Sequence, residues 1–192
     1  EAILKATGAD AVITNGGGIR ASIDAGDITK GEVITVLPFG NYVVVKKIKG
    51  SDIIAALEHG VSQYPAANGG FPHVAGIRFA FDPAAAAGSR ITKAEIGGKA
   101  LDPNAEYLLA TNDFMAVGGD NYTMFAPGPV ITELPGLDEI VMEYIANYGT
   151  ANIKVDGRVL AEEKKAQAAV EYEVKLGDVL WKIAEKFGLT YE

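Results

Sequence analysis

The spacing of apolar and polar residues predicts several short strands between two longer helices. Apolar runs or alternating patterns predict strands over four ranges, namely residues 9–15, 43–50, 76–82 and 106–113. Residues 91–103 have the pattern of a hairpin that turns at Gly97 and Gly98. Residues 1–10 are typical of the end of a helix that leads into a strand, and we expect the chain to be a piece of a longer protein.

Two stretches have the period of an amphipathic helix. Residues 51–64 begin with Ser51 as the expected N-cap and place four apolar side chains on one face, namely Ile53, Ile54, Leu57 and Val61. Residues 134–149 (LPGLDEIVMEYIANYG) predict the second helix. Because several strands cluster between the two helices, the pattern favours an α+β fold over a strictly alternating parallel one.

A run of three glycines raises the first functional question. Residues 16–21 (GGGIRA) match G-x-G-x-x-G/A, the pattern of a dinucleotide-binding turn that opens directly into a helix. Here Gly26 and Gly31 interrupt any helix, and no apolar repeat of helical period follows. No acidic residue stands about 20 residues further on, where the sequence reads TVLPFGN. We therefore interpret the glycines as a loop whose backbone can approach a ligand or another strand closely.

Composition narrows the class of protein. The chain has 192 residues, of which 48% are hydrophobic and 22% charged, and this suits one globular domain with a small appendage. A net charge of −8 makes it a poor candidate for holding a nucleic acid polymer through the phosphates. It contains no cysteine, so disulfides and thiolate metal sites are excluded. No apolar run reaches about 18 residues, so no membrane span is expected.

Candidate catalytic side chains are scarce. The two histidines, His59 and His73, stand in no metal-ligand spacing, and there is no G-x-S-x-G nucleophile motif. We therefore expect both histidines to be structural, and we expect no catalytic residue and no metal site in this chain. The pattern indicates a binding domain whose chemistry lies elsewhere.

Four stretches, in a fixed order along the chain, carry a resemblance to a known family. They are TNGGGIR (14–20), LPFGN (37–41), GGFPHVAGIRFAFD (69–82) and TNDFMAVGGDNY (111–122). Together they resemble the C-terminal, substrate-binding domain of the 5'-nucleotidase family, which includes UDP-sugar hydrolases, cyclic-nucleotide phosphodiesterases and ecto-5'-nucleotidases. The resemblance covers residues 1–158 and implies a layered α/β/β/α domain with mixed sheets.

The resemblance implies substrate-binding roles for six residues, namely Asn15, Arg20, Phe39, Asn41, Phe114 and Asp120. The two phenylalanines would sandwich the base, and the aspartate would bind the ribose hydroxyl groups. Asn41 would contact the base. Asn15 and Arg20 would contact the base and the phosphate or ribose. The family uses one further arginine upstream, and no arginine precedes Asn15 in this chain. The implied partner is a nucleoside or nucleotide.

The chemistry of these residues supports the same roles independently. Two phenyl faces can stack on any base at about 1–3 kcal/mol per face, which predicts broad base tolerance. A carboxylate such as Asp120 can accept two hydrogen bonds from a vicinal diol, and the guanidinium of Arg20 matches phosphate oxygens.

Structural roles are open for the same residues. The phenylalanines could belong to the core, Asp120 could shape a turn, and Arg20 could form a surface ion pair. Asn15 could cap the glycine turn and still bind a ligand. Phe71 and Tyr122 could either support the pocket or simply pack in the core.

The resemblance also implies the content of the whole enzyme. These proteins carry an N-terminal metallophosphatase domain with two divalent metal ions and a catalytic His-Asp pair, and rotation between the domains brings substrate to the metals. We therefore expect this domain to position the substrate and to be inactive by itself. The motifs do not choose among 5'-nucleotidase, UDP-sugar hydrolase and 2',3'-cyclic phosphodiesterase.

The composition changes at the end of the resemblance. Residues 161–170 are charged and alanine-rich and are typical of a linker after the nucleotide-binding domain, which we assign to residues 1–160. Residues 171–192 resemble the N-terminal half of a LysM module, in the pattern Y-x-V-x-x-G-D-x-L-W-x-I-A. LysM modules bind N-acetylglucosamine glycans such as peptidoglycan. An intact module would imply a secreted or cell-wall-associated bacterial enzyme. The half module in residues 171–192 is not expected to bind glycan.

A second hypothesis is a non-catalytic, wall-anchored module that binds nucleosides or serves in adhesion. Metallophosphatase motifs upstream of this chain, such as D-x-H, G-N-H-[DE] and G-H-x-H, would favour the enzyme, and their absence would favour the module.

Overall fold

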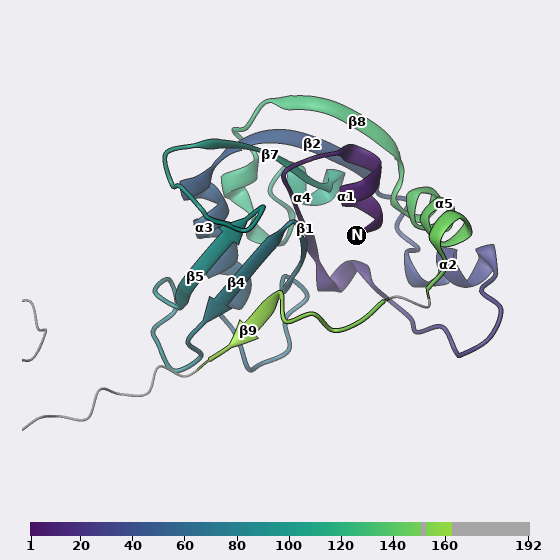
Figure 1. The fold of residues 1–192 in the computed structure, drawn as a ribbon, viewed down its shortest axis with the longest axis horizontal. Coiled ribbons are helices and arrows are strands. Elements are labelled where there is room, and N and C mark those ends of the chain that lie inside the picture. The colour runs from purple at the N-terminus through teal and green to yellow at the C-terminus, as the bar shows by residue number, and fades with distance from the viewer. Residues whose placement is uncertain (151–152, 163–192) are drawn as a thin grey trace, which may run out of the picture.

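The computed structural model describes residues 1–150 and 153–162 (Figure 1). The helices are α1 (Ala2–Thr7), α2 (Lys30–Val36), α3 (Gly50–Val61), α4 (Asp113–Ala116) and α5 (Leu137–Tyr148), with 3₁₀ turns η1 (Gly16–Gly18), η2 (Gly119–Asn121) and η3 (Thr123–Phe125). The strands are β1 (Ala11–Asn15), β2 (Tyr42–Lys49), β3 (Pro72–Ala75), β4 (Ile77–Phe81), β5 (Ile91–Ile96), β6 (Lys99–Ala100), β7 (Glu106–Asn112), β8 (Val130–Gly136) and β9 (Val159–Ala161). Within these residues, no helix combines the length and apolarity that crossing a membrane requires.

The strands form two mixed sheets, which confirms the expected α+β class. A five-stranded sheet has the order β3-β1-β7-β2-β8, and a four-stranded sheet has the order β6-β5-β4-β9. In the first sheet β1 runs parallel to β7, and in the second β4 runs parallel to β9, while the other neighbours are antiparallel. Strand β9 ends at Ala161, where we placed the start of the linker. The rest of the predicted linker and the LysM half lie outside the described residues.

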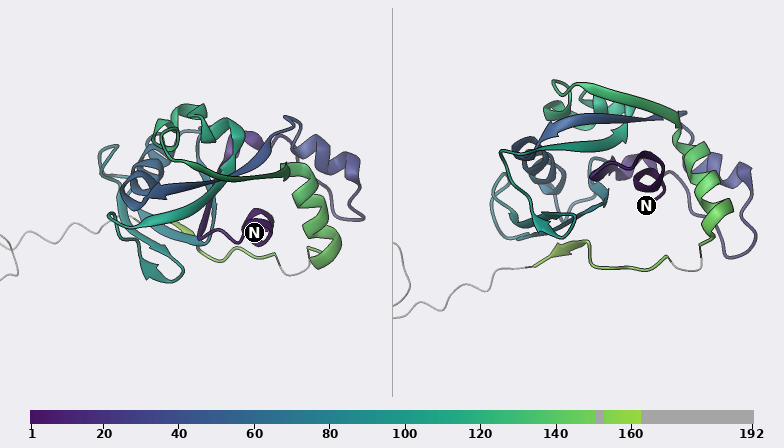
Figure 2. Two further views of the ribbon diagram at one scale, coloured as in Figure 1. Left: turned by 90° about the horizontal axis from the view of Figure 1, so that it is seen from above. Right: turned by 45° about the horizontal axis from the view of Figure 1, so that its top comes forward.

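Apolar side chains form a separate core on each face of the five-stranded sheet. On one face, α1 and α5 pack through residues such as Ile3 and Ile140. On the other face, α3 and the four-stranded sheet share a larger core that includes Leu57, Phe79 and Leu109. Two further views show α5 beside the N-terminal helix and α3 on the opposite side of the molecule (Figure 2).

Most of the predicted strands and the hairpin are confirmed. The ranges 9–15, 43–50, 76–82 and 106–113 contain β1, most of β2, β4 and β7. The hairpin of β5 and β6 turns at Gly97 and Gly98, whose φ angles of 58° and 76° lie in the left-handed region that glycine adopts easily. The helix end within residues 1–10 is α1, which stops at Gly8 in a left-handed conformation.

The predicted N-cap of α3 is wrong, although its buried face is right. The helix begins at Gly50 after the extended residue Lys49, and no side chain caps it. The amide groups of Gly50 and Ser51 instead donate to the backbone carbonyls of Ala105 and Pro103, at 2.9 Å each. Main-chain carbonyls from the turn before β7 therefore accept the hydrogen bonds that a cap side chain would otherwise accept.

Two helix predictions are corrected. Helix α5 begins later than predicted, and α2 forms where Gly26 and Gly31 were expected to prevent a helix. Residues 134–136 belong to β8, because Leu134 and Gly136 pair with β2. Helix α2 forms despite Gly31 because Thr29 and Glu32 make a complete capping box, in which each side chain bonds the other's backbone amide.

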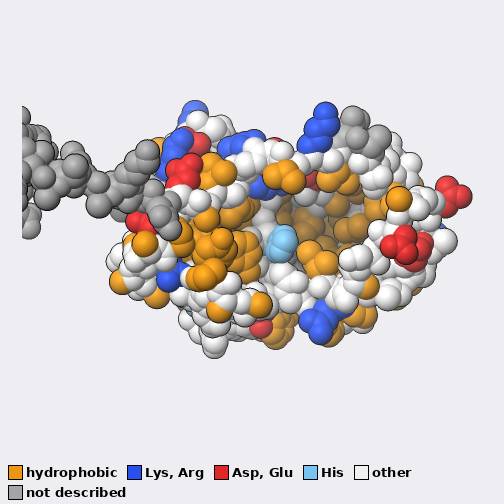
Figure 3. Space-filling model, turned by 90° about the horizontal axis from the view of Figure 1, so that it is seen from below, with side chains coloured by type: hydrophobic (Ala, Val, Ile, Leu, Met, Phe, Trp, Pro, Cys, Tyr) orange, Lys and Arg blue, Asp and Glu red, His pale blue; other side chains and the backbone are white. Residues whose placement is uncertain are grey.

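The face seen from below in Figure 1 is hollowed, and hydrophobic side chains gather around the hollow (Figure 3). A groove of about 700 Å³ lies between β3, α5 and residues 153–159. Arg158 fastens this segment, because its guanidinium donates to the carbonyl of Val74 at 2.9 Å and forms ion pairs with Asp156 and Glu1.

Candidate functional site

The structure brings all six sequence-predicted residues to one cavity of about 440 Å³. Its lining consists of Asn15, Gly17, Gly18, Arg20, Phe39, Asn41, Gly69, Phe114 and Asp120. These residues come from the end of β1 and the glycine turn, the loops after α2 and before β3, and the segment that carries α4 and η2. We call this cavity the cleft.

The floor of the cleft is made of glycine backbone. The amide of Gly17 donates to the carbonyl of Gly69 at 2.7 Å, and the amide of Gly16 donates to the carbonyl of Phe71 at 2.9 Å. A Cβ atom on Gly17 would lie only 3.1 Å from the Cα atom of Gly69. The glycines therefore permit a close approach of two main-chain segments, and no helix opens directly from them as a dinucleotide turn requires.

A chain of amide bonds holds the carboxylate of Asp120. Asn15 donates from Nδ2 to Oδ2 of Asp120 at 2.7 Å, and its Oδ1 accepts from Nδ2 of Asn112 at 2.9 Å. Oδ1 of Asn112 in turn accepts the backbone amide of Met115 at 2.8 Å and so caps α4. Asn15 and Asn112 are buried, and Asn15 makes no capping bond to the glycine turn. The side chain of Asn15 therefore orients Asp120.

The backbone of Asp120 has an uncommon conformation that a histidine supports. Asp120 and the next residue, Asn121, both have positive φ angles, 51° and 63°. Nε2 of His59 lies 2.7 Å from the carbonyl oxygen of Asp120, which places the ring proton on that nitrogen. His59, expected to be purely structural, is thus in direct contact with a predicted binding residue.

Tyr122 lies beneath this turn. It is fully buried, its hydroxyl donates to the carbonyl of Gly70 at 2.5 Å, and its ring packs edge-on against His59 at 4.9 Å. Burial, together with the nearby charge of Asp120, raises the pKa of the Tyr122 hydroxyl well above its usual value. Tyr122 therefore serves both roles that the sequence left open, core packing and support of the cleft, whereas Phe71 is half-buried and packs against the same core.

Two exposed aromatic rings form walls of the cleft. Phe39 is 60% exposed and Phe114 is 43% exposed, so neither belongs to the core. Phe39 follows α2 in a loop, whereas Phe114 lies in α4. The guanidinium of Arg20 lies 5.8 Å from the centre of the Phe39 ring, and its Nη1 donates to the carbonyl of Gly17 at 3.3 Å. Arg20 is therefore placed between one wall and the glycine floor.

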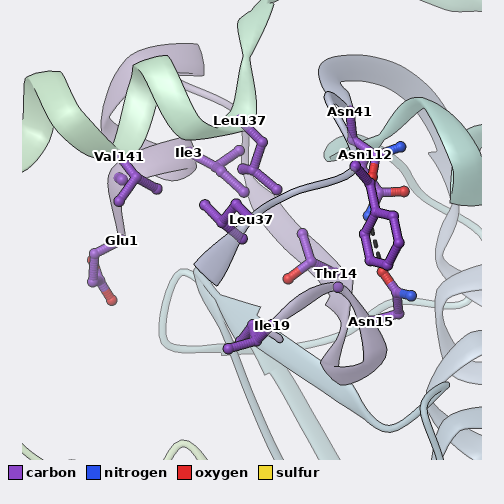
Figure 4. Close-up of a pocket in the computed structure, with 13 residues that line it drawn as sticks. Glu1, Ile3, Thr14, Asn15, Ile19, Leu37, Asn41, Asn112, Leu137 and Val141 are labelled. Carbon is purple, nitrogen blue, oxygen red and sulfur yellow. Dashed lines mark hydrogen bonds between the residues drawn. The ribbon is translucent and has the colours of Figure 1, made fainter. Parts of the chain in front are cut away.

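A second, mostly apolar cavity of about 240 Å³ adjoins the cleft (Figure 4). The two cavities share Asn15, Gly18, Phe39 and Asn41. Figure 4 shows Ile3, Leu37, Leu137 and Val141 gathered on the side away from Asn41 and Asn112. Phe39 thus lines both cavities, and the recess adds apolar side chains from α1 and α5.

Sequence reasoning missed Lys46, a buried residue of β2. Its ammonium group donates to the carbonyls of Ala116 at 2.9 Å and Ala126 at 3.1 Å, and burial lowers its pKa. One signal existed: Lys46 and Lys47 are neighbours in β2, and neighbours in a strand point to opposite faces. One lysine of the pair had to face the protein interior, and it joins β2 to the segment that carries Phe114.

Metal-binding side chains do not gather in this part of the chain. Among residues 1–150 and 153–162, no three His, Asp or Glu side chains lie close enough together to hold a metal ion. The two divalent ions that the resemblance implies therefore have no fitting site among the described residues.

Comparison with known proteins agrees with the motifs. The family model described as 5'-nucleotidase, C-terminal domain, matches residues 1–127, and the LysM domain model matches residues 172–192. The trifunctional nucleotide phosphoesterase protein YfkN of Bacillus subtilis is 42% identical over 162 residues, which cover 81% of this chain and 11% of the relative. A 5'-nucleotidase of Vibrio cholerae is 34% identical over 151 residues, which cover 77% of this chain and 25% of the relative.

A solved structure supports the same assignment. The 5'-nucleotidase precursor of Thermus thermophilus superposes with a TM-score of 0.77 at 37% identity, over 85% of this chain and 34% of that one. The chain thus spans between about a tenth and a third of the length of these proteins. Because the family model matches well over half of the chain, the protein belongs to the 5'-nucleotidase family and contains its C-terminal domain.

Proposed function

We propose that this domain binds the nucleoside part of a nucleotide substrate in the cleft. The observation that carries the proposal is the pair of exposed phenyl faces, Phe39 and Phe114, on separate elements of one cavity that also contains the Asp120 carboxylate. Two aromatic faces can hold a base by stacking, whatever its identity. A positioned carboxylate beside them can hold a ribose.

Each polar residue has a role in this proposal. Asp120, oriented by Asn15, accepts hydrogen bonds from the 2'- and 3'-hydroxyl groups of the ribose. Arg20, at the glycine floor, contacts the phosphate or ribose side of the nucleotide. Asn41 contacts the edge of the base. The domain positions the substrate and contributes no general acid or base.

The chemistry that follows binding belongs to another part of the full-length enzyme. We propose that a metallophosphatase domain supplies two divalent metal ions, which would hydrolyse the phosphate ester when bound. The share of the relatives that this chain covers, 11–34%, leaves ample length for such a domain. In this proposal the LysM region would place a secreted enzyme at the cell wall when intact, and the present chain alone releases no phosphate from AMP.

The test is a calorimetric titration of the chain with adenosine and with AMP. Two stacked faces with few other contacts predict a dissociation constant between about 10 µM and 1 mM. Phe114→Ala and Phe39→Ala should each weaken binding at least about fivefold. Tyr148→Ala, which removes an exposed aromatic ring on α5 outside the cleft, should change nothing. Absence of binding at several millimolar, or equal binding by the Phe114 variant, would contradict the proposal.

The ribose contact has its own comparison. Adenosine should bind more tightly than 2'-deoxyadenosine, and Asp120→Asn should remove most of that difference, because an amide offers only one acceptor oxygen to the diol.

A further inference from the structure

The amide of Asn41 is tied to a carboxylate that lies outside the lining of the cleft. Its Nδ2 donates to Oδ1 of Asp113 at 2.7 Å. Asp113 is the first residue of α4 and directly precedes Phe114, so the pair joins the loop that carries Phe39 to the helix that carries Phe114. Asp113 is half-buried and has no place among the six residues predicted to bind substrate.

The chemistry of this pair fixes which way the amide faces. An ionised carboxylate has acceptors and no donor, whereas an asparagine amide has an NH₂ donor on one side and a carbonyl acceptor on the other. Only the NH₂ side can face Asp113, because two oxygens at 2.7 Å without a proton would repel each other. The carbonyl oxygen Oδ1 of Asn41 therefore faces away from Asp113, and it remains for a ligand together with the second N–H of Nδ2.

We propose that Asp113 sets the base preference of the cleft by fixing the side of the Asn41 amide on which its acceptor oxygen lies. This inference rests on the proposed binding of a nucleoside between Phe39 and Phe114. The ligands it favours are nucleosides whose base presents an N–H group at the edge beside Asn41, such as the exocyclic amine of adenine. A purine that offers only ring-nitrogen acceptors leaves the Asn41 oxygen unpaired when it binds.

Asp113 is a positioning residue in this inference, since it acts through Asn41 and not on the ligand. A merely structural role would weaken the binding of every nucleoside by a similar factor. A role in orienting Asn41 changes the ratio of two affinities, so the ratio is the quantity to measure.

The experiment compares adenosine with purine riboside, which lacks the exocyclic amine and is otherwise identical. Calorimetric titration of the 192-residue chain should give adenosine an affinity about fivefold to tenfold higher, the effect of one net hydrogen bond. Asp113→Asn retains the shape of the side chain but can present either an oxygen or an NH₂ group to Asn41. Asn41 can then turn either end towards the ligand, and the preference should fall to about twofold or less.

Asp102→Asn is the matched control. Asp102 is exposed in the turn before β7, and its side chain accepts the amide of Asn104 at 2.9 Å, a bond that an amide oxygen can also make. This variant should keep the full preference for adenosine. An unchanged preference in Asp113→Asn, or equal affinities for the two nucleosides in the unmodified chain, overturns the inference while the proposed function stands. If neither nucleoside binds, the proposed function fails and this inference fails with it.

Discussion

The amide nitrogen of Asn15 and the carboxylate of Asp120 lie 2.7 Å apart, although 105 positions separate them in the sequence. The bond ties the end of β1 to the turn that follows α4, and Asn112 extends it into the cap of that helix. The ends of β1 and β7 and the start of α4 are thereby fixed relative to the carboxylate of Asp120. The anionic side chain of Asp120 in the cleft thus receives its orientation from a neutral amide.

Replacement of Asn15 by aspartate should disable this arrangement. Asn15→Asp places a second carboxylate beside Asp120, and repulsion raises the pKa of one of the two groups in the folded protein. A carboxyl group whose pKa is higher folded than unfolded favours the folded state at low pH, and the protein loses that stability as the pH rises. The unfolding midpoint of the variant should therefore fall further below that of the unmodified chain at pH 8 than at pH 4. Adenosine affinity at pH 8 should fall at least about tenfold; a pH-independent difference would contradict this account.

Gly119 should be intolerant of even one added methyl group. A Cβ atom at this position would lie 2.6 Å from the Phe114 ring and 2.5 Å from the Phe114 carbonyl oxygen. Gly119→Ala should displace the ring and weaken nucleoside binding by about fivefold or more, the effect of a lost stacking face. Gly31→Ala is the control, because Gly31 has open space around its Cα atom and lies in α2, where alanine is favoured. Equal affinity in both variants would show that the Phe114 wall does not depend on Gly119.

Lys46 should contribute to stability in a pH-dependent way. Lys46→Met leaves the buried carbonyl of Ala116 and the partly buried carbonyl of Ala126 without this donor, and should cost about 1–3 kcal/mol at pH 7. Burial lowers the pKa of Lys46 below 10.5, so at pH values between the folded and unfolded pKa the unfolded chain binds more protons. Stability of the unmodified chain relative to the variant should therefore increase as the pH rises towards 10.5.

Urea unfolding of both proteins at pH 7 and pH 10 measures this change. Lys47→Met is the matched control, because Lys47 is exposed and pairs with Glu106 at 3.7 Å on the surface. Its effect should be small at both pH values. A stability difference for Lys46→Met that shrinks with rising pH would contradict the prediction.

The segment before β9 should contribute less to the stability of the fold in acid. Hydrogen bonds from the side chain and backbone of Arg158, together with the charges of Arg158 and Arg78, lower the pKa of Asp156 to about 2. A carboxylate with a lowered pKa stabilises the fold above its unfolded pKa of 3.8, and this contribution is lost as the pH falls through about 2. Asp156→Asn should therefore lower the unfolding midpoint at pH 7, and the difference from the unmodified chain should shrink between pH 4 and pH 2. Asp24→Asn, in the exposed loop before α2, should show no such trend.

The local elements of the fold were predictable where their signal was local. Strands such as β4 and β7 need only a run of suitable residues, and the hairpin at Gly97 needs only two glycines. Helix α2 carried a local signal too, because the Thr29–Glu32 capping box offsets the low helix propensity of Gly31. The cap of α3 was not predictable in this way, because its acceptors come from residues 103–105, which lie far along the chain.

The lining of the cleft followed from the motifs, whereas its supports did not. Resemblance to the family named six residues, and the structure gathers all six around one cavity, while their roles in binding stay predictions. The supporting contacts join residues such as His59 to Asp120, Lys46 to Ala116 and Asn41 to Asp113, which are between 61 and 72 positions apart. Such pairs depend on how the sheets bring distant segments together, and no local pattern encodes them.

The contact between Gly17 and Gly69 limits how the cleft can diversify. Its floor is main chain on both sides. A Cβ atom on Gly17 would lie only 3.1 Å from the Cα atom of Gly69, so the two segments would have to move slightly apart to accept any side chain there. A change in the groups that the cleft presents must therefore come from its walls, or from a residue behind them such as Asp113. A constant floor beneath variable walls would allow such a cleft to present different donors and acceptors without any change in the path of the chain.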